Sequence, residues 1–421
     1  MARRRSHLQG GFIVKFGNIL KKTVAAVLAA VSMSAVCVTA SAAMPAPTSE
    51  FTVDNTLKVL KTYDHDSYYF VKYYLDNNMF ARETFPFWWN GASLVSGMDV
   101  GVHETYHGYT NCDAFSFDTI FSDFSNSVKI YAGNGVEYSI DHSKISGLFP
   151  TSQAVSSISS ELKTFRYPEY VSATSTADAN TKGVYGLVNE FGAYYSGLRV
   201  MSSLKPYFKK YDKDGTSWKS YYLSLNNDRT AYAEFKFWTL KYMLYAKKNK
   251  PEVYNAILND KNYCSAYTAI ETRFAALVKS ENKWAQKNLD AKYIYEDSLC
   301  SDYKALTAEL SKQSYKDMDK EIKAHADSSA NYKKIAASQI TSAKKTKSGV
   351  KLSWEKSGNA DGYYIYRSTD GGKLKKVKTV SFGDALTWTD KKAKGDSVYA
   401  YVVKPFNRTG SGKSSAKVTA E

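Results

Sequence analysis

The stretch LVSGMDVGVHETYHGY, residues 94–109, sets two histidines four positions apart, with an acid directly after the first. Residues four apart lie on the same face of a helix. The residues before the histidines are mainly apolar, which is typical of a buried helix. The stretch therefore predicts a buried helix that presents His103 and His107 on one side and ends near Gly108.

This HExxH pattern suits a zinc site, because two neutral imidazoles on one helix face can bind the same Zn²⁺ ion. Glu104 is then placed to accept a proton from the water that the ion activates. The alternative is a pair of histidines with a purely structural role. A site built on cysteines is excluded, since no two cysteines have the Cys-x-x-Cys spacing of thiolate zinc sites.

A catalytic zinc ion usually takes a third protein ligand, and Glu190 in LVNEFGAYYSGL is the predicted one. Its helix is otherwise apolar, so a lone carboxylate there needs a cation. Small residues around Glu190 allow the helix to approach another closely. The competing ligands are Asp113, Asp141, His142 and Glu234. Because bound histidines must be neutral, zinc affinity is expected to fall below about pH 6.5, the unperturbed histidine pKa.

Together the two motifs resemble those of the gluzincins, the thermolysin-like zinc peptidases. The resemblance implies that His103, His107 and Glu190 bind zinc, that Glu104 is the catalytic base, and that the substrate is a peptide or protein. Thermolysin-type enzymes carry an aspartate four residues after the glutamate ligand, which orients a ligand histidine. This chain has Tyr194 there, so another group must hold the imidazole. The candidates for stabilising the oxyanion are His142, Tyr194, Tyr195, Arg199 and Tyr232.

Outward from these motifs, residues 51–323 have mostly helical periodicity. VDNTLKVLKTY is expected to form a helix whose start is capped by Thr52 or Asp54. The helix in AYAEFKFWTLKYMLYAKKN is expected to end before Pro251. The segment SVKIYAGNGVEYSI instead predicts a β-hairpin that turns at Asn134–Gly135. The expected fold is α+β: a mainly helical zinc-peptidase domain with a small β-hairpin.

From about residue 340 the period changes to two, with short strands between turns rich in Gly, Asp, Asn and Ser. The segment resembles a fibronectin type III module, because Trp354 stands on the second strand and Tyr399, Tyr401 and Val403 alternate on a late one. Tyr399 is in the place of the family's corner tyrosine. The resemblance implies an all-β sandwich. The expected domains are a catalytic domain at 44–327, a linker at 328–339 and this module at 340–421.

Residues 1–43 are expected to be a signal peptide, with a basic start, an apolar run and small residues before the cleavage site. They hold six lysines and arginines and no acid, so their removal lowers the formal charge from +16 to +10. For an exported chain this charge points to an anionic cell wall rather than to nucleic acid. No stable membrane insertion is expected after cleavage.

The sequence therefore predicts a secreted zinc-dependent peptidase, extracellular or associated with the cell wall through its C-terminal module. Two alternatives stay open. One is a cell-surface or cell-wall binding protein with a structural or vestigial metal site, and the other is a zinc-dependent amidase. Metal content separates the binding protein from the enzymes, and product analysis separates peptidase from amidase.

Overall fold

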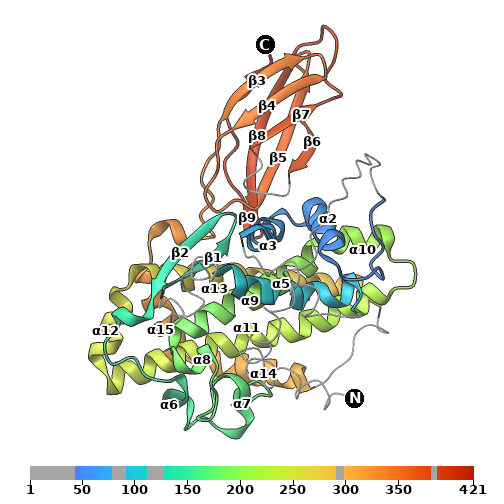
Figure 1. Ribbon diagram of the computed structural model, residues 1–421. Helices are drawn as coiled ribbons and strands as arrows, with labels where there is room; N and C mark the ends of the chain where they lie inside the picture. The colour runs from blue at the N-terminus through green and yellow to red at the C-terminus, as the bar shows by residue number, and fades with distance from the viewer. Residues whose placement is uncertain (1–42, 78–91, 111–126, 291–297, 381–385) are drawn as a thin grey trace, which may run out of the picture. The chain divides into compact units, whose positions relative to one another are not determined.

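Figure 1 shows a computed structural model of the chain, which describes residues 43–77, 92–110, 127–290, 298–380 and 386–421. All but the last residue of the predicted signal peptide, and the alternative ligand Asp113, lie outside the described residues. In the part of the chain that is described, no helix is both long enough and apolar enough to cross a membrane.

The fold is α+β, with helices as far as His325 and antiparallel sheets after them, as the sequence predicts. The α-helices are α2 (Val53–Tyr63), α3 (His65–Asn77), α5 (Leu94–Thr110), α6 (Thr151–Val155), α7 (Tyr167–Tyr170), α8 (Asp178–Thr181), α9 (Val184–Ser203), α10 (Lys205–Tyr211), α11 (Thr216–Asn249), α12 (Pro251–Asn259), α13 (Lys261–Asn288), α14 (Ser298–Leu310) and α15 (Gln313–His325).

Two predicted helix boundaries are confirmed. The Thr52 side chain caps α2 by accepting a hydrogen bond of 3.3 Å from the Asn55 N–H, which satisfies one of the amides that a helix start leaves open. Helix α11 ends at Asn249, and Pro251 begins α12, because proline fits the first turn of a helix but not its interior.

Helix α9 is the centre of the helical part and packs against α5, α11 and α13 (Figure 1). Almost its whole surface is buried, as an apolar helix with small residues requires. A Cβ atom at Gly192 would overlap the Tyr106 hydroxyl of α5, and one at Gly197 would overlap the Asp99 carboxylate. These two glycines therefore allow α5 and α9 to lie close together.

Helix α5 continues through Gly108 to Thr110, two residues past the end that the sequence predicts, and the residues after Thr110 lie outside the described part of the chain. Gly108 does not end the helix but allows it to pack closely against α3. A Cβ atom there would come within 2.6 Å of the Tyr74 ring of α3, so the absence of a side chain makes room for that ring.

The predicted hairpin is confirmed: β1 (Ser127–Gly133) pairs with β2 (Val136–Asp141) in antiparallel register. Its turn residues Asn134 and Gly135 have φ of 55° and 72°. This left-handed conformation is the one that the Asn-Gly pair favours in tight hairpins. The hairpin is joined to α5, because the Tyr106 hydroxyl donates a hydrogen bond of 2.9 Å to the Tyr131 carbonyl.

The C-terminal strands form two antiparallel sheets, ordered β3-β4-β7 and β10-β8-β5-β6, with β9 paired to β8. They are β3 (Ile340–Thr346), β4 (Gly349–Trp354), β5 (Gly362–Thr369), β6 (Lys375–Val380), β7 (Thr387–Asp390), β8 (Tyr399–Asn407), β9 (Gly410–Ser411) and β10 (Val418–Thr419). Side chains from both sheets share one core, which includes Leu352, Trp354, Tyr363, Tyr401 and Val403. Burial alternates along β4, where Val350, Leu352 and Trp354 are buried and Lys351 is exposed, as a period of two requires, whereas most of β8 is buried.

Pro45–Glu421 form one compact unit. Within it, the Asn134 side chain at the hairpin turn donates a hydrogen bond of 2.8 Å to the Ala360 carbonyl. The Lys356 ammonium in turn donates one of 3.2 Å to the Asn134 carbonyl. The predicted domain boundaries at residues 327 and 340 stay predictions.

Candidate metal centre

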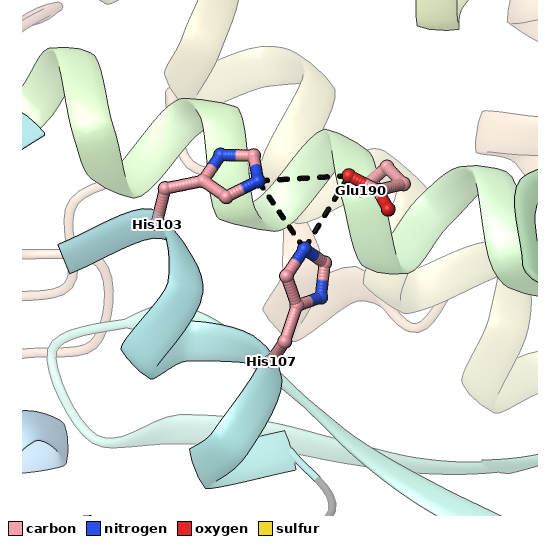
Figure 2. A group of neighbouring side chains, drawn as sticks. All are labelled: His103, His107 and Glu190. Atoms are coloured by element: carbon pink, nitrogen blue, oxygen red, sulfur yellow. Dashed lines mark hydrogen bonds and ion pairs between the residues drawn. The ribbon is translucent and has the colours of Figure 1, made fainter. Parts of the chain in front are cut away.

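Three side chains from two helices converge on one point. His103 and His107 project from the same face of α5, and Glu190 projects toward them from α9 (Figure 2). The His107 Nε2 atom lies 3.3 Å from His103 Nε2 and 3.3 Å from Glu190 Oε2, and the third side of the triangle is 3.7 Å. The structure thus brings together the three residues that the sequence predicts as ligands.

Two sides of this triangle match the donor spacing of a tetrahedral zinc ion, and the third is somewhat longer. Nitrogen ligands lie about 2.0–2.1 Å from zinc, and tetrahedral angles then place two donors about 3.3 Å apart. Among the described residues, the buried Glu190 Oε2 atom forms no hydrogen bond, and its ion pairs with the two histidines are 3.3 and 3.7 Å long. A buried carboxylate is costly unless a cation or donor pairs with it closely. A cation at the centre of the triangle would satisfy it.

Asn189, which precedes Glu190 in the chain, orients the His107 ring. The His107 Nδ1 atom lies 2.6 Å from Asn189 Oδ1, so Nδ1–H donates to the amide and Nε2 faces the triangle. The Asn189 amide donates a hydrogen bond of 3.0 Å to the Thr110 hydroxyl, which donates one of 3.0 Å to the His107 carbonyl. This closed loop fixes the ring, as outer partners of metal-binding histidines commonly do.

We expect Asn189→Ala to weaken zinc binding by about 10–100-fold, the usual effect of removing such an outer partner. Thr110→Val is the matched variant, since it loosens Asn189 but leaves the contact with His107, and its effect should be smaller. Competition with a chromophoric chelator measures both affinities. Equal affinity in the wild type and Asn189→Ala would contradict this role for Asn189.

The two histidines differ in charge when no metal is bound. Burial lowers the pKa of His103 well below its usual value, and the nearby charges of His107 and Arg166 lower it further. Burial also opposes charge on His107, but the Glu190 carboxylate outweighs it and raises the pKa of His107 to about 9. At neutral pH, His103 is therefore neutral, and His107 is protonated and paired with Glu190.

A metal ion must displace the proton of His107, so zinc affinity should fall about tenfold per pH unit below about 9 and level off above it. The fall thus begins above the unperturbed value of 6.5 that the sequence alone suggests. Calorimetry in buffers of different ionisation heat should find about one proton released per zinc ion near pH 8, and more near pH 7, where Glu104 also holds part of a proton before the ion binds. A zinc affinity that is constant from about pH 6 to 9 would rule this proton exchange out.

Glu104 follows His103 on α5 and lies within electrostatic range of the triangle. Burial raises the pKa of Glu104 to about 7, with His107 opposing the rise and Glu190 and Glu169 adding to it. A carboxyl group with a pKa near neutrality can both accept and release a proton at physiological pH, as general acid-base catalysis requires. A nearby divalent cation would lower the pKa and favour the carboxylate, the form that accepts the proton.

Tyr194 packs against His103, the other histidine of the triangle. Its ring lies edge-on to the His103 ring, with centroids 4.4 Å apart. The Arg166 Nε–H donates a hydrogen bond of 2.9 Å to its hydroxyl. Burial raises the pKa of Tyr194, and Arg166 opposes that rise. Sequence reasoning missed Arg166, because its segment has no periodic pattern and lies 24 positions before Glu190.

The other predicted candidates are engaged elsewhere. Glu234 is fully buried and forms an ion pair of 2.7 Å with Arg166, so it is not part of the triangle. Asp141 caps the turn after β2 that contains His142. Three more oxyanion candidates contact other groups: Tyr195 the Phe274 ring, Arg199 the Asp64 and Asp66 carboxylates, and Tyr232 the Glu271 carboxylate.

The chain matches no protein-family model, no curated protein and no solved structure. Its function is therefore inferred from the side chains of the candidate metal centre.

Proposed function

We propose that this protein is a secreted zinc-dependent peptidase in which His103, His107 and Glu190 hold the metal ion. The observation that carries the proposal is the triangle of donor atoms at tetrahedral spacing, 3.3–3.7 Å apart, beside a carboxyl group whose pKa is about 7. Three protein ligands leave one position open, which is the arrangement of catalytic rather than structural zinc sites.

When bound there, zinc acidifies a water molecule and polarises the substrate carbonyl. Glu104 accepts the proton of the attacking water and later delivers it to the leaving amine. His107 keeps its Nε2 atom turned toward the metal through the hydrogen bond of its Nδ1–H to Asn189.

Membership of the gluzincin class is part of the proposal. It is supported by the Asn-Glu pair on α9, in which Glu190 faces both histidines and Asn189 contacts His107. The chain departs from the thermolysin pattern at Tyr194, whose ring packs on His103 where an aspartate would hold it.

We also propose that the C-terminal sheets are a fibronectin type III-like module that associates with the cell wall. The Tyr399 hydroxyl donates a hydrogen bond of 2.8 Å to the Lys394 carbonyl, five residues upstream, which is the geometry of a tyrosine corner. The basic charge of the chain after its predicted signal peptide supports an anionic neighbour.

The test is metal analysis of the purified chain from residue 44 onward, together with mass spectrometry of a mixed peptide library after incubation. One zinc ion per chain and cleavage that a chelator abolishes and zinc restores are the expected results. A protein that binds no zinc would instead fit the cell-wall binding protein. Zinc without peptide cleavage, but with hydrolysis of non-peptide amides, would identify an amidase.

A further inference from the structure

Beside the metal ligands lies a pair of tyrosine hydroxyl groups. Glu190 and Tyr194 are four residues apart on α9 and so project from the same face of the helix. The Tyr194 hydroxyl lies 3.1 Å from the Tyr170 hydroxyl of α7. One turn of helix thus carries both a metal ligand and a hydroxyl group that is not part of the triangle.

Arg166 fixes the Tyr194 hydroxyl in place. Its side chain is only 3% exposed, and Nε donates to Tyr194, Nη1 to Glu234 and Nη2 to Asn227. Because a guanidinium group is rigid and planar, these three contacts leave it no freedom to turn away. Glu234 is fully buried, so the ion pair cannot be replaced by water.

The contact with Arg166 leaves the Tyr194 hydroxyl free to act as a hydrogen-bond donor. Its oxygen accepts a hydrogen bond from a charged donor, so its own proton is available to an acceptor. Accepting from a cation also strengthens the hydroxyl group as a donor. In the structure the Tyr170 hydroxyl lies within hydrogen-bond distance of it, and a more negative oxygen would take its place.

We propose that Tyr194, backed by Arg166, donates a hydrogen bond to the carbonyl oxygen of the scissile amide as that oxygen becomes negatively charged. This inference rests on the proposed peptidase function. When the water oxygen bonds to the carbonyl carbon, the π electrons of the C=O bond move to its oxygen, and Glu104 takes the proton. When the C–N bond breaks, the C=O bond reforms and the amine takes that proton. Tyr194 keeps its own proton throughout.

Tyr194 is a catalytic residue in this scheme, and Arg166 is a positioning residue that acts through it. A purely structural reading is that Tyr194 only packs against His103. The two roles predict different effects on kcat when Tyr194→Phe removes the hydroxyl oxygen. Phenylalanine keeps the ring on His103, so packing is preserved and only the hydrogen bond is lost.

The experiment compares Tyr194→Phe with the matched variant Tyr170→Phe. In Tyr194→Phe we expect unchanged zinc stoichiometry, a KM within about twofold and a kcat about 10²–10³-fold lower, the usual effect of losing one oxyanion donor. Its affinity for a phosphinic peptide, which mimics the tetrahedral intermediate, should fall by the same factor as kcat/KM. Tyr170→Phe should stay within about tenfold of the wild type, since in this scheme the Tyr170 hydroxyl acts on the substrate only through Tyr194 and its ring contact with Phe235 is kept.

Arg166 is tested in the double variant Arg166→Gln with Glu234→Gln, because removing one charge alone leaves its partner buried and unpaired. When Tyr194→Phe is added to this double variant, kcat should fall by a smaller factor than when Tyr194→Phe is made in the wild type. The reason is that loss of Arg166 and loss of the Tyr194 hydroxyl weaken the same hydrogen bond to the substrate.

Two results would overturn the inference: a kcat in Tyr194→Phe within twofold of the wild type, or loss of zinc from that variant. The proposed function fails separately, if the zinc-loaded wild type cleaves no peptide; that result would also remove the basis for this role of Tyr194.

Discussion

Replacing Glu104 by glutamine is expected to leave one zinc ion bound per chain and to lower kcat/KM by about 10²–10⁴-fold, the usual contribution of a positioned acid-base group. Glutamine has nearly the same shape but cannot accept the proton of the attacking water. The protein should stay folded, because burial already raises the pKa of Glu104 to about 7 and so favours the neutral form in the absence of metal. The proposed ligands His103, His107 and Glu190 are unchanged in this variant.

Glu169 of α7 supplies the matched control. It is an exposed carboxylate within electrostatic range of Glu104 and Glu190, so Glu169→Gln changes the local charge by the same amount. It should alter kcat/KM by less than about tenfold, since a group that only adds to the field contributes less than the proton acceptor. Full activity in Glu104→Gln, or an equal loss in both variants, would exclude Glu104 as the base.

Loss of the third ligand should have the second large effect. Glu190→Ala is expected to weaken zinc binding by more than about 100-fold, because removal of an outer partner alone weakens it by about 10–100-fold. With the two histidines left, the ion lacks the only carboxylate in the triangle. Folding should be retained, because His107 loses the carboxylate that raises its pKa and becomes neutral, so that no unpaired charge stays buried.

Glu234→Ala separates ligand loss from general damage to the fold. Glu234 holds Arg166 rather than the triangle, so this variant should bind zinc normally. It should be destabilised instead, by about 3–5 kcal/mol, because Arg166 is left buried without its partner. Zinc competition gives the affinities, and thermal unfolding gives the stabilities. Full zinc binding by Glu190→Ala together with loss in Glu234→Ala would transfer the ligand role to Glu234.

Local patterns in the sequence were enough to predict much of the fold and the three residues of the triangle. The four-residue spacing of His103 and His107 acts within one helix, and the Asn134–Gly135 turn acts within one hairpin. Glu190 could be predicted because an acid on an apolar helix needs a partner. In each case the residues that determine the local structure lie within a few positions of one another in the sequence.

What the sequence did not predict depends on contacts between distant segments. Gly108 carries the signal of a helix end, but the Tyr74 ring of α3 requires the absence of a side chain there. Arg166 reaches Tyr194 and Glu234 from a stretch between α-helices. No periodicity marks such a residue, since its neighbours in space are set by how the helices pack.

The close crossing of α5 and α9 has a consequence for how such a site can be lost over generations. Gly192 lies two residues after Glu190 and faces the Tyr106 hydroxyl, which is buried and tied to Tyr131. A single added methyl group at Gly192 would push the two helices apart and carry Glu190 away from the histidines. A descendant could thus lose the proposed metal centre while every residue of the HExxH and Asn-Glu motifs stayed in place, so inheritance of those motifs alone would not show that the proposed activity had been inherited.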